Sequence, residues 1–201
     1  MPSLIYENRL RQKGYRLITG IDEVGRGPLA GPVVAAAVIL PAKSAIKRLN
    51  DSKLLSADQR NRLSKQIRKK AVAISVGVAG HLESDRLNIS GANRLAMERA
   101  VAGLNVKPDF LLIDGGRSRI KSDVPQQGLT GGDRKSAAIA AASIIAKVAR
   151  DRMMQKYHYL YPRYRFDRHK GYGTALHNKL LRQLGPSPIH RRSFAPVGAL
   201  S

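Results

Sequence analysis

Short apolar runs alternate with charged amphipathic stretches along this 201-residue chain. The apolar runs are rich in β-branched residues, which is typical of buried strands. The charged stretches carry apolar residues at helical spacing, and two of them follow a serine, Ser56 or Ser90, that can cap a helix. We therefore expect strands over residues 17–21, 33–40, 71–79 and 110–113, and helices over 57–70, 90–102, 135–159 and 174–184.

The connections between these elements indicate how they are arranged. Only a short turn with Gly25 and Gly27 separates the first two strands, so we expect an antiparallel hairpin. Residues 115–132 are rich in glycine, serine and basic residues and are expected to form a mobile loop. The long helix is rich in alanine, whose small side chain permits close approach to a sheet. The pattern predicts an α/β protein, with a small mixed sheet and helices packed on it and beyond it.

Composition adds a partner to this picture. Apolar residues make up 43% of the chain, and its length suits one well-buried core rather than two domains. Lysine and arginine number 36 against 14 acidic residues, a net charge of +22. Such an excess is typical of proteins that bind a polyanion, most often nucleic acid.

Three features of the sequence bear on the cellular compartment of the protein. It has no cysteine, which excludes disulfides and thiolate zinc sites. The first residues lack the basic segment and apolar core of a signal peptide. The longest apolar run, residues 28–42, is too short to span a bilayer and is interrupted by proline. We therefore expect a soluble, cytoplasmic protein with no membrane partner, and a monomer because the chain is so highly charged.

Acidic residues stand at the ends of two predicted strands. Asp22 and Glu23 close the first, and Asp114 closes the strand that begins at residue 110. If these strands are neighbours, Asp22 and Asp114 lie side by side, and Asp133 precedes the alanine-rich helix. Carboxylates gathered in this way suit Mg²⁺ or Mn²⁺. Two such ions about 4 Å apart can activate a water and stabilise the leaving oxygen of a phosphodiester.

One difficulty and three simpler explanations accompany this hypothesis. Consecutive strand residues point to opposite faces, so Asp22 and Glu23 can share a metal only if the strand ends or bulges there. Asp133 can be an ordinary N-cap, and Asp114 can belong to a plain turn. The first two acids can form a solvated turn paired with Arg26. The coincidence of all three features favours a metal site.

Ordered motifs along nearly the whole chain resemble those of the ribonuclease HII family. The most specific is the opening GIDEVGRGPLAGPV over residues 20–33. The later blocks are Asp51-Ser52-Lys53, Ile113-Asp114-Gly115, and residues 132–136, 140–148, 150–152, 169–174 and 190–194. The resemblance implies a ribonuclease H-like fold, with a mixed five-stranded sheet flanked by helices. It also implies a single domain, 1–201, with a catalytic core to about residue 160 and a helical C-terminal extension over about 161–201.

The resemblance further implies a reaction and its metal site. The expected enzyme is an endoribonuclease that hydrolyses the RNA strand of RNA–DNA hybrids. It also nicks on the 5′ side of single ribonucleotides in duplex DNA, leaving 5′-phosphomonoesters. The resemblance implies Mn²⁺ or Mg²⁺, with two ions during catalysis. The implied catalytic and metal-binding residues are Asp22, Glu23, Asp114 and Asp133.

The resemblance also implies a substrate-binding set. Gly25, Arg26 and Gly27 become the turn that reads the 2′-OH, Tyr172 becomes the ring that stacks on the sugar, and Lys53 becomes a phosphate contact. A hydroxyl is what distinguishes ribose from deoxyribose, and a glycine turn lets the backbone approach a sugar closely. Taken alone, the tyrosine can equally be a packing residue and the arginine a partner for the acids. The family's commonest form has alanine where this chain has valine at 24, a change that removes no ligand.

Other polar residues leave alternatives open. The helix over 57–70 is strongly basic and would attract a duplex, although a solvated face explains most of its residues singly. The five histidines have no metal-ligand spacing, and none is expected to be a general base. His169 lies near Tyr172 in the sequence and is a candidate for a phosphate contact. A non-catalytic RNA-binding protein would share the charge but not the acids at strand ends. A junction resolvase would share the acids but would not need the glycine-arginine-glycine turn.

Overall fold

One mixed sheet of five strands forms the centre of the protein. The computed structural model describes residues 2–43, 46, 49, 52 and 55–200. The strand order is β3-β2-β1-β4-β5; β3, β2 and β1 pair antiparallel, and β4 and β5 continue the sheet in parallel with β1. This confirms the expected hairpin and mixed sheet. The strands are β1 (Ile18–Val24), β2 (Val33–Ile39), β3 (Ala73–Ala79), β4 (Phe110–Asp114) and β5 (Gln126–Leu129).

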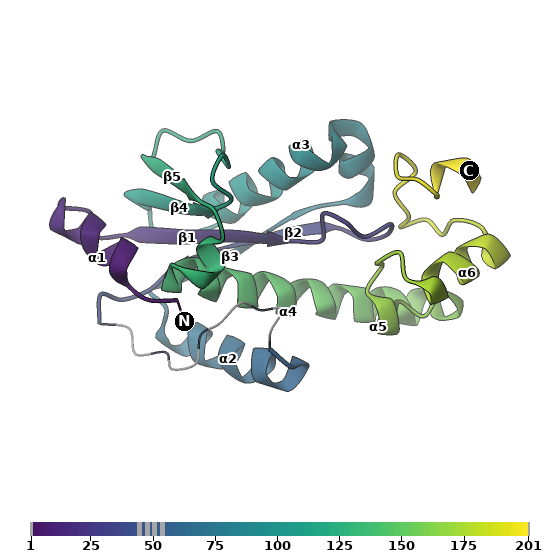
Figure 1. Cartoon of the computed structure of the whole chain (residues 1–201), viewed down its shortest axis with the longest axis horizontal. Coiled ribbons are helices and arrows are strands. Elements are labelled where there is room, and N and C mark those ends of the chain that lie inside the picture. The colour runs from purple at the N-terminus through teal and green to yellow at the C-terminus, as the bar shows by residue number, and fades with distance from the viewer. Residues whose placement is uncertain (1, 44–45, 47–48, 50–51, 53–54, 201) are drawn as a thin grey trace.

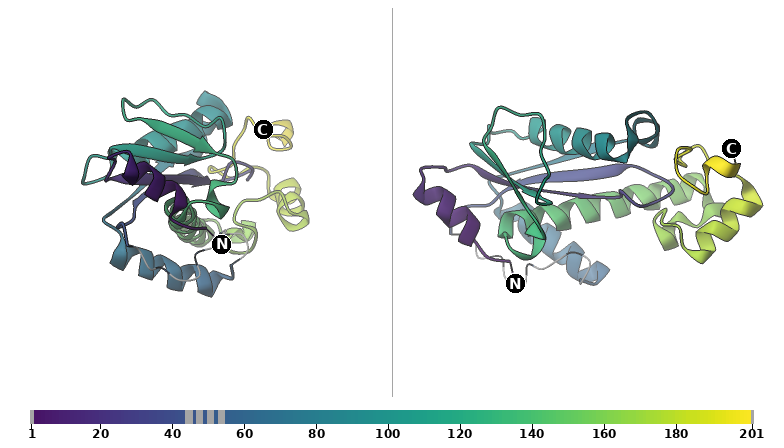
Figure 2. Two further views of the ribbon diagram at one scale, coloured as in Figure 1. Left: turned by 60° about the vertical axis from the view of Figure 1, so that its left-hand side comes forward. Right: turned by 45° about the horizontal axis from the view of Figure 1, so that its top comes forward.

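Helices cover both faces of the sheet (Figures 1 and 2). The helix α3 packs on one face, and α4 and α2 pack on the other. The expected helix over 57–70 is confirmed, and Ser56 caps it by accepting a hydrogen bond from the Gln59 N–H. The helices are α1 (Ile5–Gln12), α2 (Ala57–Lys70), α3 (His81–Ala102), α4 (Ala137–Leu160), α5 (Phe166–His169) and α6 (Ala175–Leu184). Short 3₁₀ turns occupy Gly132–Arg134 (η2), Pro162–Tyr164 (η3) and Gly198–Leu200 (η4).

The alanine-rich helix α4 lies very close to β1. A side chain at Gly20 would collide with the main chain of Ala138, so only glycine fits at this crossing. The first three turns of α4 are almost entirely buried, which explains their small residues. The expectation that alanine permits close approach to the sheet is therefore confirmed. This contact fixes the depth at which α4 lies beneath the ends of β1 and β4.

The predicted start of the helix over 90–102 is wrong. The helix α3 begins at His81, not at Ser90, and it contains a kink at Asn88, where φ is 57°. The Asn88 side chain accepts hydrogen bonds from the N–H groups of Ser90 and Gly91, so it caps the second segment in place of the predicted serine. Asparagine tolerates positive φ better than most residues, which places the kink here.

The stretch expected to be a mobile loop contains an edge strand. Residues 126–129 form β5 and pair in parallel with β4, from Leu111 with Gln126 to Asp114 with Leu129. The strand is short and carries Gly128, so no alternation of apolar residues marks it in the sequence. Its pairing holds the segment after β4 against the sheet.

The helix α1 was not among the predicted elements, and it supports the start of α4. Glu7 is buried, and its Oε1 accepts hydrogen bonds from the Ser136 hydroxyl at 2.6 Å and the Ala138 N–H at 2.9 Å. A carboxylate beside the first turn of a helix also complements its dipole. The long-range hydrogen bonds between Ser3 and the residues flanking Ser136 add to this anchor.

Glu7→Ala is expected to destabilise the fold by about 2–3 kcal/mol, since it leaves a buried hydroxyl and a buried amide without an acceptor. For a chain of this size, that corresponds to a fall in Tm of roughly 5–10 °C. Thermal unfolding followed by circular dichroism measures it. The matched control is Asp58→Ala, which removes an exposed acid from the first turn of α2 and should cost under about 1 kcal/mol. Equal effects in the two variants would contradict the structural role given to Glu7.

The elements after α4 gather at one end of the molecule, beyond the sheet (Figure 1). Phe166 is fully buried there and packs with Tyr164 and three histidines. The backbone of this end contacts the segment between β1 and β2, where Leu29 N–H donates to the Gly171 carbonyl and Gly31 N–H to the Ile189 carbonyl. The end of the chain is thus joined to the turn that follows the paired acids. Among the helices that the structure describes, none is long and apolar enough to cross a membrane.

Candidate active site

Asp22 and Asp114 lie at the same edge of the sheet. The strands β1 and β4 are parallel neighbours whose last register pair is Ile21 with Ile113, so each acid follows directly after a paired isoleucine. Asp22 is 6% exposed, and it is hydrogen-bonded by the Ser143 side chain of α4. The expectation that these acids share adjacent strand ends holds in the structure.

Glu23 occupies the next position of β1. It pairs in register with Ala35, and the strand continues to Val24 without a bulge at the acidic pair. Successive side chains therefore leave the strand on opposite faces, which is the difficulty that the sequence already raised for a shared metal. The carboxylate of Glu23 is 3.5 Å from the Arg26 guanidinium. The strand ends one residue beyond the pair, at the glycine turn, and this keeps both acids at the open edge of the sheet.

The carboxylates at this edge influence one another's pKa. Burial raises the pKa of Asp22 well above its usual range, and the charges of Glu23 and Asp114 raise it further. Burial also raises the pKa of Glu23; Arg26 opposes this shift and Asp114 adds to it. Three mutually repelling acids at one edge form the environment that a divalent cation relieves. The donor set therefore fits a hard metal ion that prefers oxygen ligands.

Asp133 lies close to the same edge, but it does not cap α4. The N-cap is Ser136, whose Oγ accepts from the Ile139 N–H, so the simpler explanation offered for Asp133 is wrong. Asp133 is 6% exposed in η2, and the preceding Gly132 N–H donates to Asp114 Oδ1 at 2.7 Å. Within the described ranges, no three acidic or histidine side chains already stand as a complete metal cage. The side chains would have to converge on a cation when it binds.

The glycine turn after β1 is held by a buried arginine. Gly25 has φ of +94°, a conformation that favours glycine. Arg191 is fully buried and donates five hydrogen bonds to main-chain carbonyls of Gly25, Arg26, Pro28 and Gly31, at 2.6 to 3.0 Å. Burial, with the nearby charge of a second arginine, lowers its pKa to about 10. The C-terminal tail thereby fixes the shape of the turn.

That second arginine, Arg150 of α4, joins the turn to Tyr172. Its guanidinium donates to the carbonyls of Ala30, Pro32 and Lys170 at 2.9 to 3.2 Å. The same group lies 5.6 Å from the centre of the Tyr172 ring, and the Lys147 ammonium lies 5.9 Å from it on the same helix. Tyr172 is 39% exposed, so its ring is available to a ligand rather than enclosed in the core.

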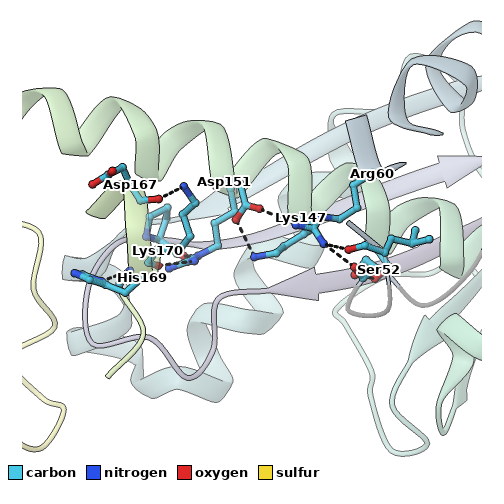
Figure 3. Close-up of polar contacts among 12 residues, drawn as sticks. Ser52, Arg60, Lys147, Asp151, Asp167, His169 and Lys170 are labelled. Atoms are coloured by element: carbon cyan, nitrogen blue, oxygen red, sulfur yellow. Dashed lines mark hydrogen bonds and ion pairs between the residues drawn. The ribbon is translucent and has the colours of Figure 1, made fainter. Parts of the chain in front are cut away.

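A polar chain leads from Asp22 along α4, and part of it is visible in Figure 3. The hydroxyl of Ser143 lies 2.9 Å from that of Ser52, whose carbonyl accepts from Arg60 at 3.0 Å. Arg60 also pairs with Asp151, which accepts a 2.8 Å hydrogen bond from Lys147. Lys53, the predicted phosphate contact, lies outside the described residues.

Sequence reasoning gave no role to several of these residues. Ser143, Lys147, Arg150 and Arg191 all support the predicted site, and all four lie within the motif blocks over 140–148, 150–152 and 190–194. The serine is also a hydroxyl within an otherwise apolar helical stretch. The arginines are a few among many basic residues, and nothing in the spacing distinguishes a buried cation from a solvated one.

Three of the five histidines meet in the structure, although nothing in their sequence spacing indicates this. His169, His177 and His190 meet in the core of the C-terminal end; the rings of the first two stack at 4.1 Å, and Nε2 atoms of the last two lie 3.0 Å apart. His169 is buried and its Nε2 faces the Tyr164 carbonyl at 2.7 Å, so the suggested phosphate contact is wrong. His177 Nδ1 bonds the Tyr172 carbonyl at 2.9 Å, which connects this cluster to the exposed ring.

The histidine pair predicts acid sensitivity. Burial lowers the pKa of His177 and His190 to about 4 in the folded protein, against 6.5 when exposed. Between these values the unfolded chain binds more protons, so stability is full above pH 6.5 and falls as the pH drops toward 4. Uptake of one proton by the pair corresponds to a loss of about 3 kcal/mol. Tm measured from pH 7 to 4 should show a smaller fall in His177→Gln than in wild type, with His158→Gln as control; parallel curves for all three would contradict the prediction.

The sequence of this chain matches one family of known proteins over most of its length. A family model described as Ribonuclease HII matches residues 19–197. Ribonuclease HII of Desulfitobacterium hafniense (strain Y51) is 55% identical over 191 residues, 95% of this chain and 73% of that protein. Ribonuclease HII of Geobacter sulfurreducens is 53% identical over 192 residues, 96% of this chain and 88% of that protein.

Solved structures of related proteins share the fold. Ribonuclease H2 from Pyrococcus horikoshii OT3 superposes with a TM-score of 0.76 at 26% identity, over 91% of this chain and 96% of that one. Bst-RNase HIII, solved in complex with Mn²⁺, superposes with a TM-score of 0.70 at 21% identity, over 98% of this chain and 72% of that one.

Proposed function

Because this chain belongs to the ribonuclease HII family, we propose that the acids at the ends of β1 and β4 and in η2 form its catalytic site. As a member of that family, the chain is an endoribonuclease that cleaves RNA in RNA–DNA hybrids and at ribonucleotides embedded in duplex DNA. We further propose that it nicks on the 5′ side of a single ribonucleotide, as a monomer. The observation that carries the proposal is the position of Asp22 and Asp114 beside a turn held by Arg191.

The proposed metal ligands are Asp22, Glu23, Asp114 and Asp133. Ribonucleases H depend on divalent metal, and we propose Mg²⁺ or Mn²⁺ here. Two such ions would activate a water and stabilise the leaving oxygen of the phosphodiester. The Gly132 N–H donates to Oδ1 of Asp114, which fixes the orientation of this carboxylate.

Ser143 has a positioning role in this proposal. Its hydroxyl hydrogen-bonds Asp22, and the hydroxyl of Ser52 stands behind it at 2.9 Å. The bond favours the charged form of the carboxylate and opposes the rise in pKa that burial causes. Ser143 thereby orients Asp22 and favours its ionised form.

Recognition of the ribonucleotide is assigned to the turn and to Tyr172. Gly25 and Gly27 carry no side chain, so the main chain on either side of Arg26 can approach a 2′-OH. Arg191 and Arg150 hold this segment from behind by its carbonyls, which preorganises the turn. The half-exposed ring of Tyr172 is available to stack on a sugar.

A nicking assay tests the proposal. Purified protein is expected to nick a DNA duplex with one ribonucleotide on its 5′ side when Mg²⁺ or Mn²⁺ is added, and not in the presence of chelator. An all-DNA duplex of the same sequence is the control and should stay intact. Equal cleavage of both duplexes would favour a resolvase, and binding without cleavage at any metal concentration would favour a non-catalytic RNA-binding protein.

A further inference from the structure

A cavity of about 390 Å³ opens beside the carboxylates, on the side of the sheet that α3 covers. We name it the arginine pocket after its lining. Four arginines contribute to its wall, together with polar residues of α3. The residues that matter here are Arg26, Arg94, Arg117, Arg119, Ser90 and Asn93.

The arginine pocket adjoins the proposed catalytic site at two points. Arg26 lines it and lies 3.5 Å from Glu23, and Gly115 lines it and directly follows Asp114. The opposite wall comes from Ser90 and Arg94, on one face of the α3 segment that starts after the kink. A ligand in this pocket would therefore lie next to the acids without occupying their position.

The loop that carries Arg117 and Arg119 is held in place. Ile120 N–H donates to the side chain of Gln126 at 3.0 Å, and the same side chain donates back to the Ile120 carbonyl at 3.0 Å. Lys121 N–H donates to a carboxylate of α3 at 2.8 Å. The arginines are thus presented from an anchored loop, which lowers the entropic cost of binding a ligand.

The charge of the pocket is not balanced from within. Among the described residues no carboxylate lines it, and Arg94, Arg117 and Arg119 form no ion pair there. Guanidinium groups converging on one cavity suit an anion with several oxygens, above all a phosphate.

We propose that the arginine pocket binds a backbone phosphate of the duplex, a few linkages from the one that is cut. The inference rests on the proposed function and extends it, because this contact would set the register of the duplex relative to the acids. Phosphate contacts of this kind position a nucleic acid without reading its sequence. Because the pocket has a fixed position beside the acids, we expect it to contact the phosphate of one particular linkage in the bound duplex.

The test uses the double variant Arg117→Gln/Arg119→Gln. Binding of a duplex with one ribonucleotide is measured by fluorescence anisotropy in chelator, over a range of salt concentrations. We expect affinity to fall about tenfold at low salt, and the slope of log affinity against log salt to fall by about one. The charge-matched control is Arg62→Gln/Lys69→Gln, which removes two exposed cations from α2, across the sheet from the pocket.

A series of duplexes with one neutral methylphosphonate linkage separates a direct contact from general attraction. In wild type, one position near the ribonucleotide should weaken binding about tenfold, and in the pocket variant that position should have no further effect. The α2 control should keep the wild-type response. If the pocket variant and wild type respond alike at every position, the inference is overturned. Because these readouts need no cleavage, a failed nicking assay would count against the proposed function while leaving this result to stand or fall alone.

Discussion

Asp114→Asn should lower the rate of cleavage at an embedded ribonucleotide by about 10³-fold or more while leaving duplex binding intact. The substitution removes the charge that a divalent ion requires, and losing one ligand of a two-metal site costs several kcal/mol of transition-state stabilisation. Asparagine keeps an oxygen that can accept from the Gly132 N–H, so the fold around η2 should survive. Single-turnover cleavage and anisotropy binding measure the two quantities.

The control for this variant is Asp123→Asn, which removes one negative charge from an exposed position elsewhere. It should cleave at the wild-type rate. Binding by Asp114→Asn should equal that of wild type or exceed it slightly, because a repelling charge has gone. Retained cleavage in Asp114→Asn would remove this residue from the catalytic site.

Arg191→Gln is expected to have the largest effect on stability. Arg191 donates five buried hydrogen bonds, and a shorter neutral side chain leaves most of the carbonyls around Gly25 without a donor. A loss of about 3–5 kcal/mol follows, or a fall in Tm of roughly 10 °C or more. The control is Arg182→Gln, an exposed arginine of α6, which should change Tm little.

A second readout separates positioning of the turn from stability alone. At a temperature where Arg191→Gln is still folded, its kcat on the single-ribonucleotide duplex should fall more than its KM rises. Arg191→Lys should restore part of the stability, because lysine can donate to some of the carbonyls, but it lacks the fork that serves several at once. Wild-type kcat in folded Arg191→Gln would show that the turn does not depend on the tail.

Several parts of the fold could be predicted because local patterns determined them. The apolar β2 strand, the α2 helix with its Ser56 cap, and the alanine-rich helix beside Gly20 each follow from residue types within one element. The β5 strand and α1 could not be predicted in this way. One depends on pairing with β4 and the other on a buried contact of Glu7, and both are long-range effects.

The residues of the candidate site likewise differ in whether local sequence or long-range contacts reveal them. The acids were found because carboxylates at strand ends are conspicuous in so basic a chain. The supporting arginines were missed because their burial arises only when the C-terminal end folds against the turn, as it does at Arg191 and Arg150. For Asp133 only the capping alternative is wrong, since Ser136 caps α4 three residues later. The division into a core to about residue 160 and an extension stays a prediction.

The central claim is that carboxylates from β1, β4 and η2 share divalent cations. The most direct measurement is an anomalous difference map, at the manganese absorption edge, from crystals grown with Mn²⁺ and a duplex carrying one uncleavable ribonucleotide linkage. We predict peaks bounded by Asp22, Glu23, Asp114 and Asp133, beside the glycine turn. Ordered carboxylates with manganese bound only elsewhere on the protein would contradict the account.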